Sequence, residues 1–318
     1  MTMRIISEAE MSGNTPLRHV MASLSDVFQD LRGGKEQSPS RMLLNHGPSE
    51  MLISPAGWMK RGVASVKITT LTPGNSTQGL PLIHGVVVLT DINTGQIMAL
   101  LDGAALTAVR TSAVAGLATH LCAPAGAADL AILGAGVQAR ATLLAMLAVR
   151  QIARVRIYSR TIARTEAFVQ WARTVTAAQV VICQSLFDAV QGAEIICTTT
   201  STSSCEPLIA ADWVAPGAHL NIIGGTHEDA IEVDPVLLKT AFVVVETGPS
   251  AQEDAGEVRT ALNKGYIQPA HLHELGALIL GEVAANEGQT TLFRSVGLAI
   301  EDTAAALALY EFREKMAC

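Results

Sequence analysis

The residues best suited to chemistry begin with a glycine-rich turn. The stretch from Asp129 to Ala139 has the sequence DLAILGAGVQA, in which an apolar run precedes Gly134 and Gly136 and an alanine-rich segment of helical composition follows. We predict a strand, a tight turn and a helix. Such a turn binds a pyrophosphate, because glycine permits the sharp turn and close backbone approach and the helix offers free N–H groups. The glycines alone fit an ordinary turn equally well.

The end of the next predicted strand bears on which dinucleotide fits. At this position Asp or Glu accepts a hydrogen bond from the ribose 2′-hydroxyl of NAD(H) and would repel a 2′-phosphate. Here the strand from Val155 to Tyr158 ends in Ser159-Arg160-Thr161, with Arg164 one turn later and no carboxylate. A guanidinium and two hydroxyls favour the phosphate of NADPH over NADH. The alternative is that Arg160 is an ordinary solvated surface residue.

Three cations in the N-terminal half stand in apolar or β-rich surroundings, namely Arg41, Lys67 and Arg110. Lys67 alternates with Val66 and Ile68 in a predicted strand, where an unpaired charge is costly. A substrate carboxylate would satisfy such groups, and Arg can bind it through two hydrogen bonds. Taken singly, each cation is better explained by a solvent-reaching or salt-bridged side chain.

Histidines and cysteines indicate no metal centre. A lone His is more often a structural group than an acid, a base or a ligand, and His271 and His273 lack other clear metal ligands nearby. The five cysteines are odd in number and form no C-x-x-C pair. This pattern is typical of a reducing compartment and argues against a disulfide framework.

The composition indicates a compact globular protein of two domains that binds small molecules. The chain has 318 residues, of which 49% are hydrophobic and 16% charged. Its net charge of −7 argues against nucleic-acid binding. No signal-peptide pattern opens the chain, and no apolar stretch reaches about 18 residues. We therefore expect a cytoplasmic protein with no membrane partner.

Periodicity predicts the elements that position these residues. The N-terminal part should contain a strand at Arg4 to Ile6, a helix from Pro16 to Leu31, β-structure from 41 to 101 with a hairpin turn at 93–95, and a helix from 103 to 121. The middle should alternate strands with helices. The strands are predicted at 131–133, 155–158, 180–183, 194–198, 220–224 and 242–246. The first is followed by a helix that ends at Val149, the second by a helix that runs through Trp171, and the third by a turn at 187–191. A helix should run from Leu292 to Phe312. The alternation implies an α/β protein with a parallel sheet covered on both faces.

Ordered motifs along nearly the whole chain resemble the ornithine cyclodeaminase/μ-crystallin family. They include KITTLTPGN, GLPLIHGVVVLTDINTGQIMALLDGAALTAVRTSA, ILGAGVQAR, EPLIAADWVAPGAHLNIIGG and TLFRSVGLAIEDTAAALALY. The resemblance implies a Rossmann-type doubly wound parallel sheet domain at 121–297. It also implies an α+β substrate-binding and dimerisation domain at 1–120, completed by the C-terminal helix at about 298–318. Family members bind NAD(H) or NADP(H) and act on small amino acids or cyclic imino acids, and we expect a homodimer.

The resemblance also assigns roles to residues. Arg41, Lys67 and Arg110 match the basic residues that hold the substrate carboxylate, which favours the functional interpretation of these cations. We expect Ser54, His84 and His227 in the substrate pocket. The predicted cofactor contacts are Thr111, Gly134, Ala135, Gly136, Val137, Gln138, Ser159, Arg160, Thr161, Arg164, Thr198, Thr199 and Val296.

Two departures from the family pattern narrow the reaction. Where cyclodeaminases carry an Asp after two glycines this chain has Thr226, and where they carry a Glu it has Leu52. Cyclodeamination and amino-acid dehydrogenation need a titratable group to move protons, which threonine cannot supply. We therefore predict NADPH-dependent reduction of Δ1-pyrroline-2-carboxylate, and also of Δ1-piperideine-2-carboxylate, to L-proline or L-pipecolate. The alternatives are a cyclodeaminase or amino-acid dehydrogenase that uses His227, and a non-catalytic NADPH-dependent binder of the μ-crystallin kind.

Overall fold

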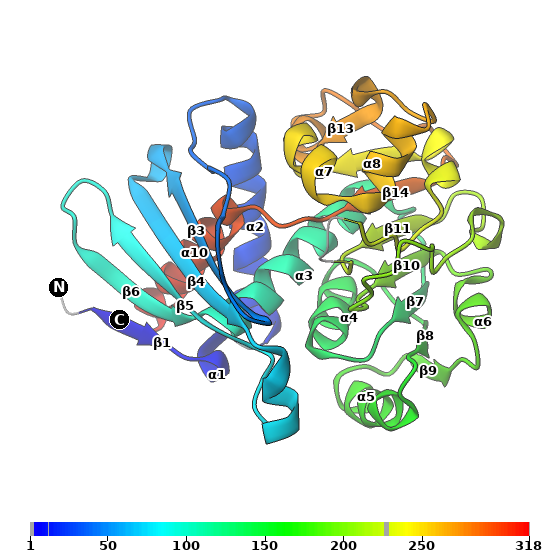
Figure 1. The fold of residues 1–318 in the computed structure, drawn as a ribbon, viewed down its shortest axis with the longest axis horizontal. Coiled ribbons are helices and arrows are strands. Elements are labelled where there is room, and N and C mark those ends of the chain that lie inside the picture. Colours follow the sequence, from blue (N-terminus) through cyan, green and yellow to red (C-terminus); the bar gives the residue numbers. More distant parts are fainter. Residues whose placement is uncertain (1–2, 12, 226–228, 318) are drawn as a thin grey trace. The chain divides into compact units, whose positions relative to one another are not determined.

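The chain forms two compact units in a computed structural model (Figure 1), which describes residues 3–11, 13–225 and 229–317. Unit 1 comprises Met1–Ala113 and Gly297–Cys318, and unit 2 comprises Val114–Val296. The first boundary therefore lies within helix α3 (Gly103–Cys122), several residues before the expected position at 120. The helix crosses the boundary without interruption, and the breaking residues Pro124 and Gly126 come only after it ends.

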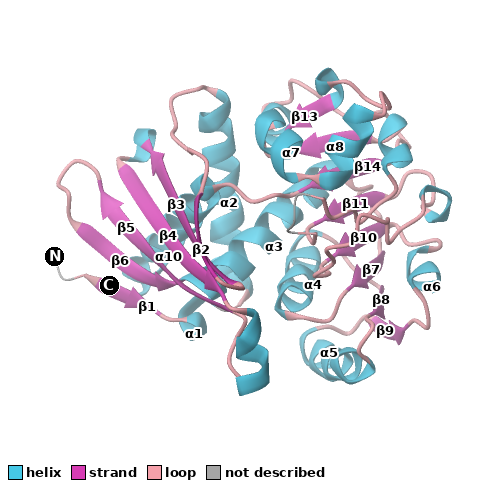
Figure 2. Cartoon of the chain, viewed as in Figure 1, coloured by secondary structure: helices cyan, strands magenta, loops and turns pink. Residues whose placement is uncertain are grey.

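Unit 1 is built on a six-stranded sheet in the order β1-β6-β5-β4-β3-β2 (Figure 2). The strands are β1 (Arg4–Ile6), β2 (Met42–His46), β3 (Ser49–Trp58), β4 (Val63–Leu71), β5 (Ile83–Asp91) and β6 (Ile97–Asp102). Strands β2 to β6 pair antiparallel in chain order, whereas β1 pairs parallel with β6. The predicted hairpin turn at 93–95 is confirmed, since the Gly95 N–H donates to the Asp91 carbonyl at 2.8 Å.

Helix α10 (Ala299–Ala317) packs on one face of this sheet, and α2 (Asn14–Arg32) packs on α10. Unit 1 also contains α1 (Glu8–Met11) and the first part of α3. Alternate residues of β4 are buried, and one of them, Ser65, forms a 2.8 Å hydrogen bond with Thr303 of α10. On the other side of α10, Ser23 of α2 donates to the Ala304 carbonyl at 2.9 Å. The β4 face that carries Ser65 and Lys67 is therefore the core face of unit 1.

Unit 2 is an eight-stranded parallel sheet in the order β13-β12-β14-β11-β10-β7-β8-β9. The strands are β7 (Asp129–Leu133), β8 (Arg154–Tyr158), β9 (Gln179–Ile182), β10 (Ile195–Thr198), β11 (His219–Ile222), β12 (Phe242–Val245), β13 (Leu272–Glu274) and β14 (Thr291–Arg294). The helices are α4 (Val137–Val149), α5 (Ile162–Val175), α6 (Leu186–Val190), α7 (Gly248–Asp254), α8 (Gly256–Asn263) and α9 (Leu275–Ile279). Helices α4 and α6 lie on opposite sides of the sheet in Figure 1, which confirms the predicted Rossmann-type architecture.

The prediction of helix from Leu292 was wrong at its start. Residues Thr291–Arg294 form the fully buried strand β14, which pairs with β11 on one side and β12 on the other, and the helix begins only at Ala299. The tertiary pairing decides, because the four-residue segment Thr-Leu-Phe-Arg is too short for its periodicity to separate strand from helix. The turn expected at 187–191 belongs largely to α6, which Ser185 caps by accepting from the Asp188 N–H at 3.0 Å.

A buried histidine makes the stability of unit 2 sensitive to acid. His219 is fully buried in β11 and hydrogen-bonded to Thr291 at 2.8 Å, and burial lowers its pKa from 6.5 to about 3. Between pH 6.5 and pH 3 this histidine is protonated in the unfolded chain and neutral in the folded chain. The free energy of unfolding therefore falls as the pH is lowered from 6.5 toward 3. Between pH 7 and pH 5 we expect a loss of about 2 kcal/mol from this residue. Urea unfolding at the two pH values checks this in wild type and His219→Asn, with the exposed His46→Asn as control. An equal pH dependence in all three proteins contradicts the prediction.

Candidate functional site

The glycine-rich turn lies between the ends of two strands that flank β7. The Gly134 N–H donates to the Tyr158 carbonyl at 2.8 Å, and the Thr199 N–H donates to the Leu133 carbonyl at 2.7 Å. Gly134 has φ 111°, and a Cβ there would lie 2.7 Å from the Thr199 carbonyl oxygen. Only glycine fits this turn, because a side chain would meet backbone in a conformation that other residues avoid.

Gly136 faces open space at the start of α4. It is exposed, occupies the N-cap position without a side-chain cap, and has no atom within 4 Å of a Cβ placed on it. Close by in sequence, the buried Oε1 atom of Gln138 accepts no hydrogen bond from the described residues. The first N–H groups of α4 are uncapped, and no side chain fills the space in front of them. Such a helix start fits the pyrophosphate of a dinucleotide.

The second predicted turn lies at the same edge of the sheet. Strands β7 and β8 run parallel with Leu133 opposite Tyr158, so Ser159-Arg160-Thr161 follows β8 next to the glycine-rich turn. Thr161 is the N-cap of α5, and its N–H lies 3.5 Å from Ser159 Oγ. Arg160 and Arg164 are exposed. The edge therefore offers two guanidinium groups beside the predicted pyrophosphate site.

The ends of β10 and β14 are held by buried carboxylates that sequence reasoning missed. Thr198 is fully buried, and its hydroxyl donates to Glu232, whose pKa burial raises. Val296 donates its N–H to Glu246 at 2.8 Å. Thr198 thus faces a carboxylate, whereas Thr199 is half-buried and donates from its hydroxyl to the Leu133 carbonyl at 3.0 Å. Thr226 and His227 lie outside the described residues.

Unit 1 holds two of the predicted cations in a buried cluster with two acids. The Lys67 Nζ lies 2.7 Å from Asp302 Oδ2, and Arg110 lies 3.0 Å from Glu301 Oε2 and 3.3 Å from Asp302 Oδ1. Both acids belong to the first turn of α10. Burial lowers the pKa of Lys67 and Asp302 opposes that shift. Gly297 gives the guanidinium room, since a Cβ there would lie 2.8 Å from Arg110 Nη1.

The structure brings a third predicted residue to this cluster and places two others elsewhere on the sheet. Ser54 of β3 is buried and lies opposite Lys67 in the antiparallel register, so the two side chains share a face. Arg41 is exposed just before the edge strand β2, and His84 is exposed near the start of β5. Thr111, the residue after Arg110 in α3, is buried.

Sequence reasoning missed the acids of this cluster although a signal exists. Glu301 and Asp302 stand side by side in AIEDTAAALALY, an otherwise apolar helix. Charged residues in such a segment are costly unless they meet opposite charges, which is the argument already applied to Lys67. The pairing of these two signals could have predicted the ion pairs.

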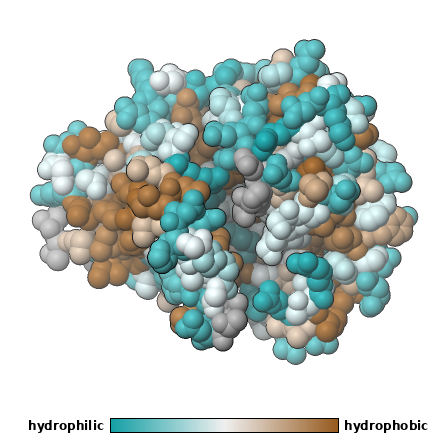
Figure 3. Space-filling view, viewed as in Figure 1, coloured by the Kyte–Doolittle hydropathy of each residue, from teal (hydrophilic) through white to brown (hydrophobic). Residues whose placement is uncertain are grey.

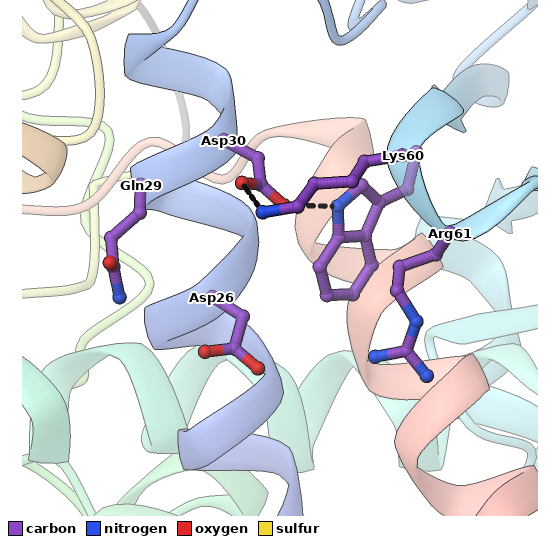
Figure 4. A pocket seen from close by; sticks show the side chains of 6 residues that line it. Asp26, Gln29, Asp30, Lys60 and Arg61 are labelled. Carbon is purple, nitrogen blue, oxygen red and sulfur yellow. Dashed lines mark hydrogen bonds and ion pairs between the residues drawn. The ribbon is translucent and has the colours of Figure 1, made fainter.

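A separate pocket in unit 1 contains none of the predicted residues (Figure 4). It is lined by Asp26, Gln29, Asp30, Trp58, Lys60 and Arg61. Asp30 accepts from the Trp58 indole N–H at 2.9 Å and from the Lys60 Nζ at 2.6 Å, so its carboxylate is satisfied within the protein. Arg61 pairs with Glu311 at 2.5 Å. These contacts explain the pocket as a structural feature.

Among the residues that the structure describes, no group of three or more His, Cys, Asp or Glu is placed to hold a metal ion. In the same part of the chain no helix has the length and apolar character needed to cross a membrane.

The parallel sheet, its glycine-rich turn and the uncapped start of α4 define a dinucleotide-binding α/β protein. The chain belongs to the ornithine cyclodeaminase/mu-crystallin family, whose model matches residues 2–316, and the predicted membership is confirmed.

Similar proteins include two reductases and one solved structure. The chain is 32% identical over 315 residues to a Delta(1)-pyrroline-2-carboxylate reductase of Bacillus cereus, covering 97% of this chain and 96% of the relative. It is 35% identical over 260 residues to ketimine reductase mu-crystallin of Mus musculus, covering 81% and 79%. The structure of Thermococcus litoralis Delta(1)-pyrroline-2-carboxylate reductase in complex with NADH and L-proline matches with a TM-score of 0.91 at 28% identity, covering 99% and 98%.

Two glycine substitutions separate the roles of the turn. Gly136→Ala should leave the melting temperature unchanged and weaken NADPH binding about tenfold or more, because its Cβ enters the space predicted for the pyrophosphate. Gly134→Ala should instead destabilise the fold by about 1–3 kcal/mol, because it combines positive φ with a clash against Thr199. Thermal melts and NADPH titrations of both variants check this. Wild-type NADPH affinity in Gly136→Ala contradicts the predicted phosphate site.

Proposed function

We propose that this protein is an NADPH-dependent reductase of a cyclic ketimine carboxylate. Its substrate would be Δ1-pyrroline-2-carboxylate, or the six-membered Δ1-piperideine-2-carboxylate, and its product L-proline or L-pipecolate. The observation that carries the proposal is the burial of two cations, Lys67 and Arg110, in one cluster. It is supported by the similarity of this chain to family members that are named as reductases of such imines. The chain is accordingly an oxidoreductase acting on an imino acid.

The side chains of unit 1 supply what a preformed imine needs. Lys67 and Arg110 neutralise and orient the carboxylate, with Arg41 as a third cation. Glu301 and Asp302 hold the two buried cations in place, so little rearrangement is needed when substrate binds. NADPH would supply the hydride, which adds to the carbon of the C=N bond.

The proton on the imine nitrogen comes from Lys67 or from solvent. Lys67 suits this role because burial lowers its pKa, which makes its ammonium a readier donor. Thr226, with His84 and His227, would complete the pocket without adding a carboxylate. A reductase needs no group to activate water against the imine, which agrees with Thr226 at the position where cyclodeaminases carry Asp.

The choice of NADPH rests on the edge next to the glycine-rich turn. Arg160, Thr161 and Arg164 are exposed there, and Ser159 beside them is half-buried. A 2′-phosphate would gain charge-assisted hydrogen bonds from these groups, whereas the free hydroxyl of NADH would leave the cations without that partner. The free cysteines Cys122, Cys183, Cys197 and Cys205 support a reducing, cytoplasmic location.

We further propose that the protein is a homodimer that uses the open face of the unit 1 sheet. Because α10 covers the face with Ser65 and Lys67, the intervening side chains point to the other face. One row across the strands is entirely apolar and partly or fully exposed, and comprises Pro55, Val66, Val88, Leu100 and Ile5. Figure 3 shows hydrophobic residues gathered over this sheet. A second copy of the same face is the partner that matches it in shape and polarity.

Turnover with purified protein tests the proposed reaction. We expect NADPH oxidation with one or both cyclic imines, and we expect Arg160→Ala to lower kcat/KM for NADPH about tenfold or more, with little change for NADH. Arg173→Ala, an exposed arginine on α5, is the matched control. Lys67→Ala should lose turnover and retain NADPH binding.

Other results of this assay would identify the alternatives. Absence of turnover with both imines contradicts the proposal. Release of ammonia from ornithine or lysine, or reduction of NADP by an amino acid, would indicate a cyclodeaminase or an amino-acid dehydrogenase. Tight NADPH binding without any turnover would indicate a binding protein.

The dimer face can be tested separately from the chemistry. Val66→Lys combined with Val88→Lys should convert a dimer to a monomer, because the charges would be buried at the proposed interface without partners. Light scattering after size-exclusion chromatography measures the change, with the exposed Val181→Lys of unit 2 as control. A wild-type monomer, or an unchanged mass in the double variant, contradicts the proposed interface.

A further inference from the structure

Arg294 binds the backbone at the ends of two neighbouring strands of unit 2. It is the last residue of β14, and only 1% of it is exposed. Its Nη1 donates to the carbonyls of Gly224 at 2.9 Å, Ser295 at 2.8 Å and Ile222 at 3.3 Å, and its Nη2 donates to the Gly225 carbonyl at 2.9 Å. One guanidinium therefore holds the segment that leaves β11 and the segment that leaves β14.

A buried carboxylate fixes the guanidinium in turn. Glu257 in the first turn of α8 is fully buried, and its Oε1 lies 2.6 Å from Arg294 Nε. The preceding Gly256 allows this approach, because a Cβ there would lie 2.4 Å from the Ala230 carbonyl oxygen. Arg294 cannot rotate away from the carbonyls without leaving Glu257 as an unpaired buried charge.

Stability alone gives a weak reason for such a pair. Burying two charges removes them from water at a cost that their mutual attraction often only balances. The carbonyls of Gly224, Gly225 and Ser295 lie beyond the ends of β11 and β14, outside the hydrogen-bond ladder of the sheet. The gain from the pair is the fixed geometry of these two segments.

The direction of the dinucleotide places these segments beside its reactive end. The pyrophosphate is predicted at β7 and the 2′-phosphate at β8, on one side of β7 in the sheet. The nicotinamide half must then extend the other way, across the ends of β10, β11 and β14, which follow in that order. These are carboxyl ends of parallel strands, where such sheets bind ligands.

We propose that Arg294, held by Glu257, is a positioning residue for hydride transfer. It fixes the backbone at Gly224–Gly225 and Ser295, and thereby the surface on which the nicotinamide ring rests. The inference depends on the proposed function for its cofactor. It adds a residue pair that touches neither substrate nor cofactor and acts through the backbone.

Arg294→Lys tests this role because it keeps the charge opposite Glu257 and loses the guanidinium fork that reaches several carbonyls. We expect kcat for imine reduction to fall about tenfold or more, because the nicotinamide is less well positioned for hydride transfer. The primary isotope effect with 4-deuterated NADPH should rise, and the KM for NADPH should change less than about twofold. Glu257→Gln, which keeps the guanidinium, should show a smaller effect of the same kind. The exposed Arg154→Lys is the matched control.

A second readout does not depend on turnover. The fluorescence of bound NADPH reports the surroundings of its nicotinamide, and we expect Arg294→Lys to change the emission maximum or intensity at saturating cofactor. Wild-type kcat per folded enzyme and wild-type emission, with only a lower melting temperature, would overturn the inference and leave Arg294 a purely structural residue. Absence of wild-type turnover would instead contradict the proposed reaction, and the emission of bound NADPH would still decide the role of Arg294.

Discussion

Burial of charge against opposite charge is the constraint on which both units depend. In unit 1 the first turn of α10 brings Glu301 and Asp302 against Arg110 and Lys67, and in unit 2 Glu257 lies against Arg294. A buried charge without a partner is far more costly than a paired one, so each side chain restricts the position of the other. The two clusters therefore fix the positions of Lys67, Arg110 and Arg294, to which we assign functional roles, although burying their charges costs solvation free energy.

The parallel sheet of unit 2 adds a second constraint, since the carboxyl ends of all its strands lie along one edge. The glycine-rich turn, Ser159-Arg160-Thr161, Thr199 and Val296 follow different strands and meet at that edge for this reason. The N–H groups of Gly134 and Thr199 donate to neighbouring strand ends, and the Val296 N–H donates to the buried Glu246. The hydroxyl of Thr198, next to Thr199, donates to the buried Glu232. These contacts hold the proposed dinucleotide site in place without a ligand, which would lower the entropy cost of binding.

Periodicity and turn residues predicted most elements, because helix and strand patterns are local. The strands of unit 1, the hairpin at 93–95 and the alternation from Asp129 onward are confirmed. Strand β14 was wrongly expected as helix, since a segment of four residues is too short to separate the two patterns. The acids were missed for a different reason. Glu232 and Glu257 are ordinary charged residues in the sequence, and only their burial shows that they need partners. Glu301 and Asp302 stand out in an apolar segment, but their partners lie far away along the chain.

The sequence by itself determined the family, the fold class and the chemical types at the site, because ordered motifs and the residues after each strand are local properties. It predicted that Lys67 and Arg110 lie in costly surroundings, and it left their partners open. The tertiary structure decided those partners, since Asp302 lies more than two hundred residues from Lys67 along the chain and 2.7 Å from it in the fold. It likewise decided the contacts of Arg294, because the four carbonyls that it binds converge only when β11 and β14 lie side by side.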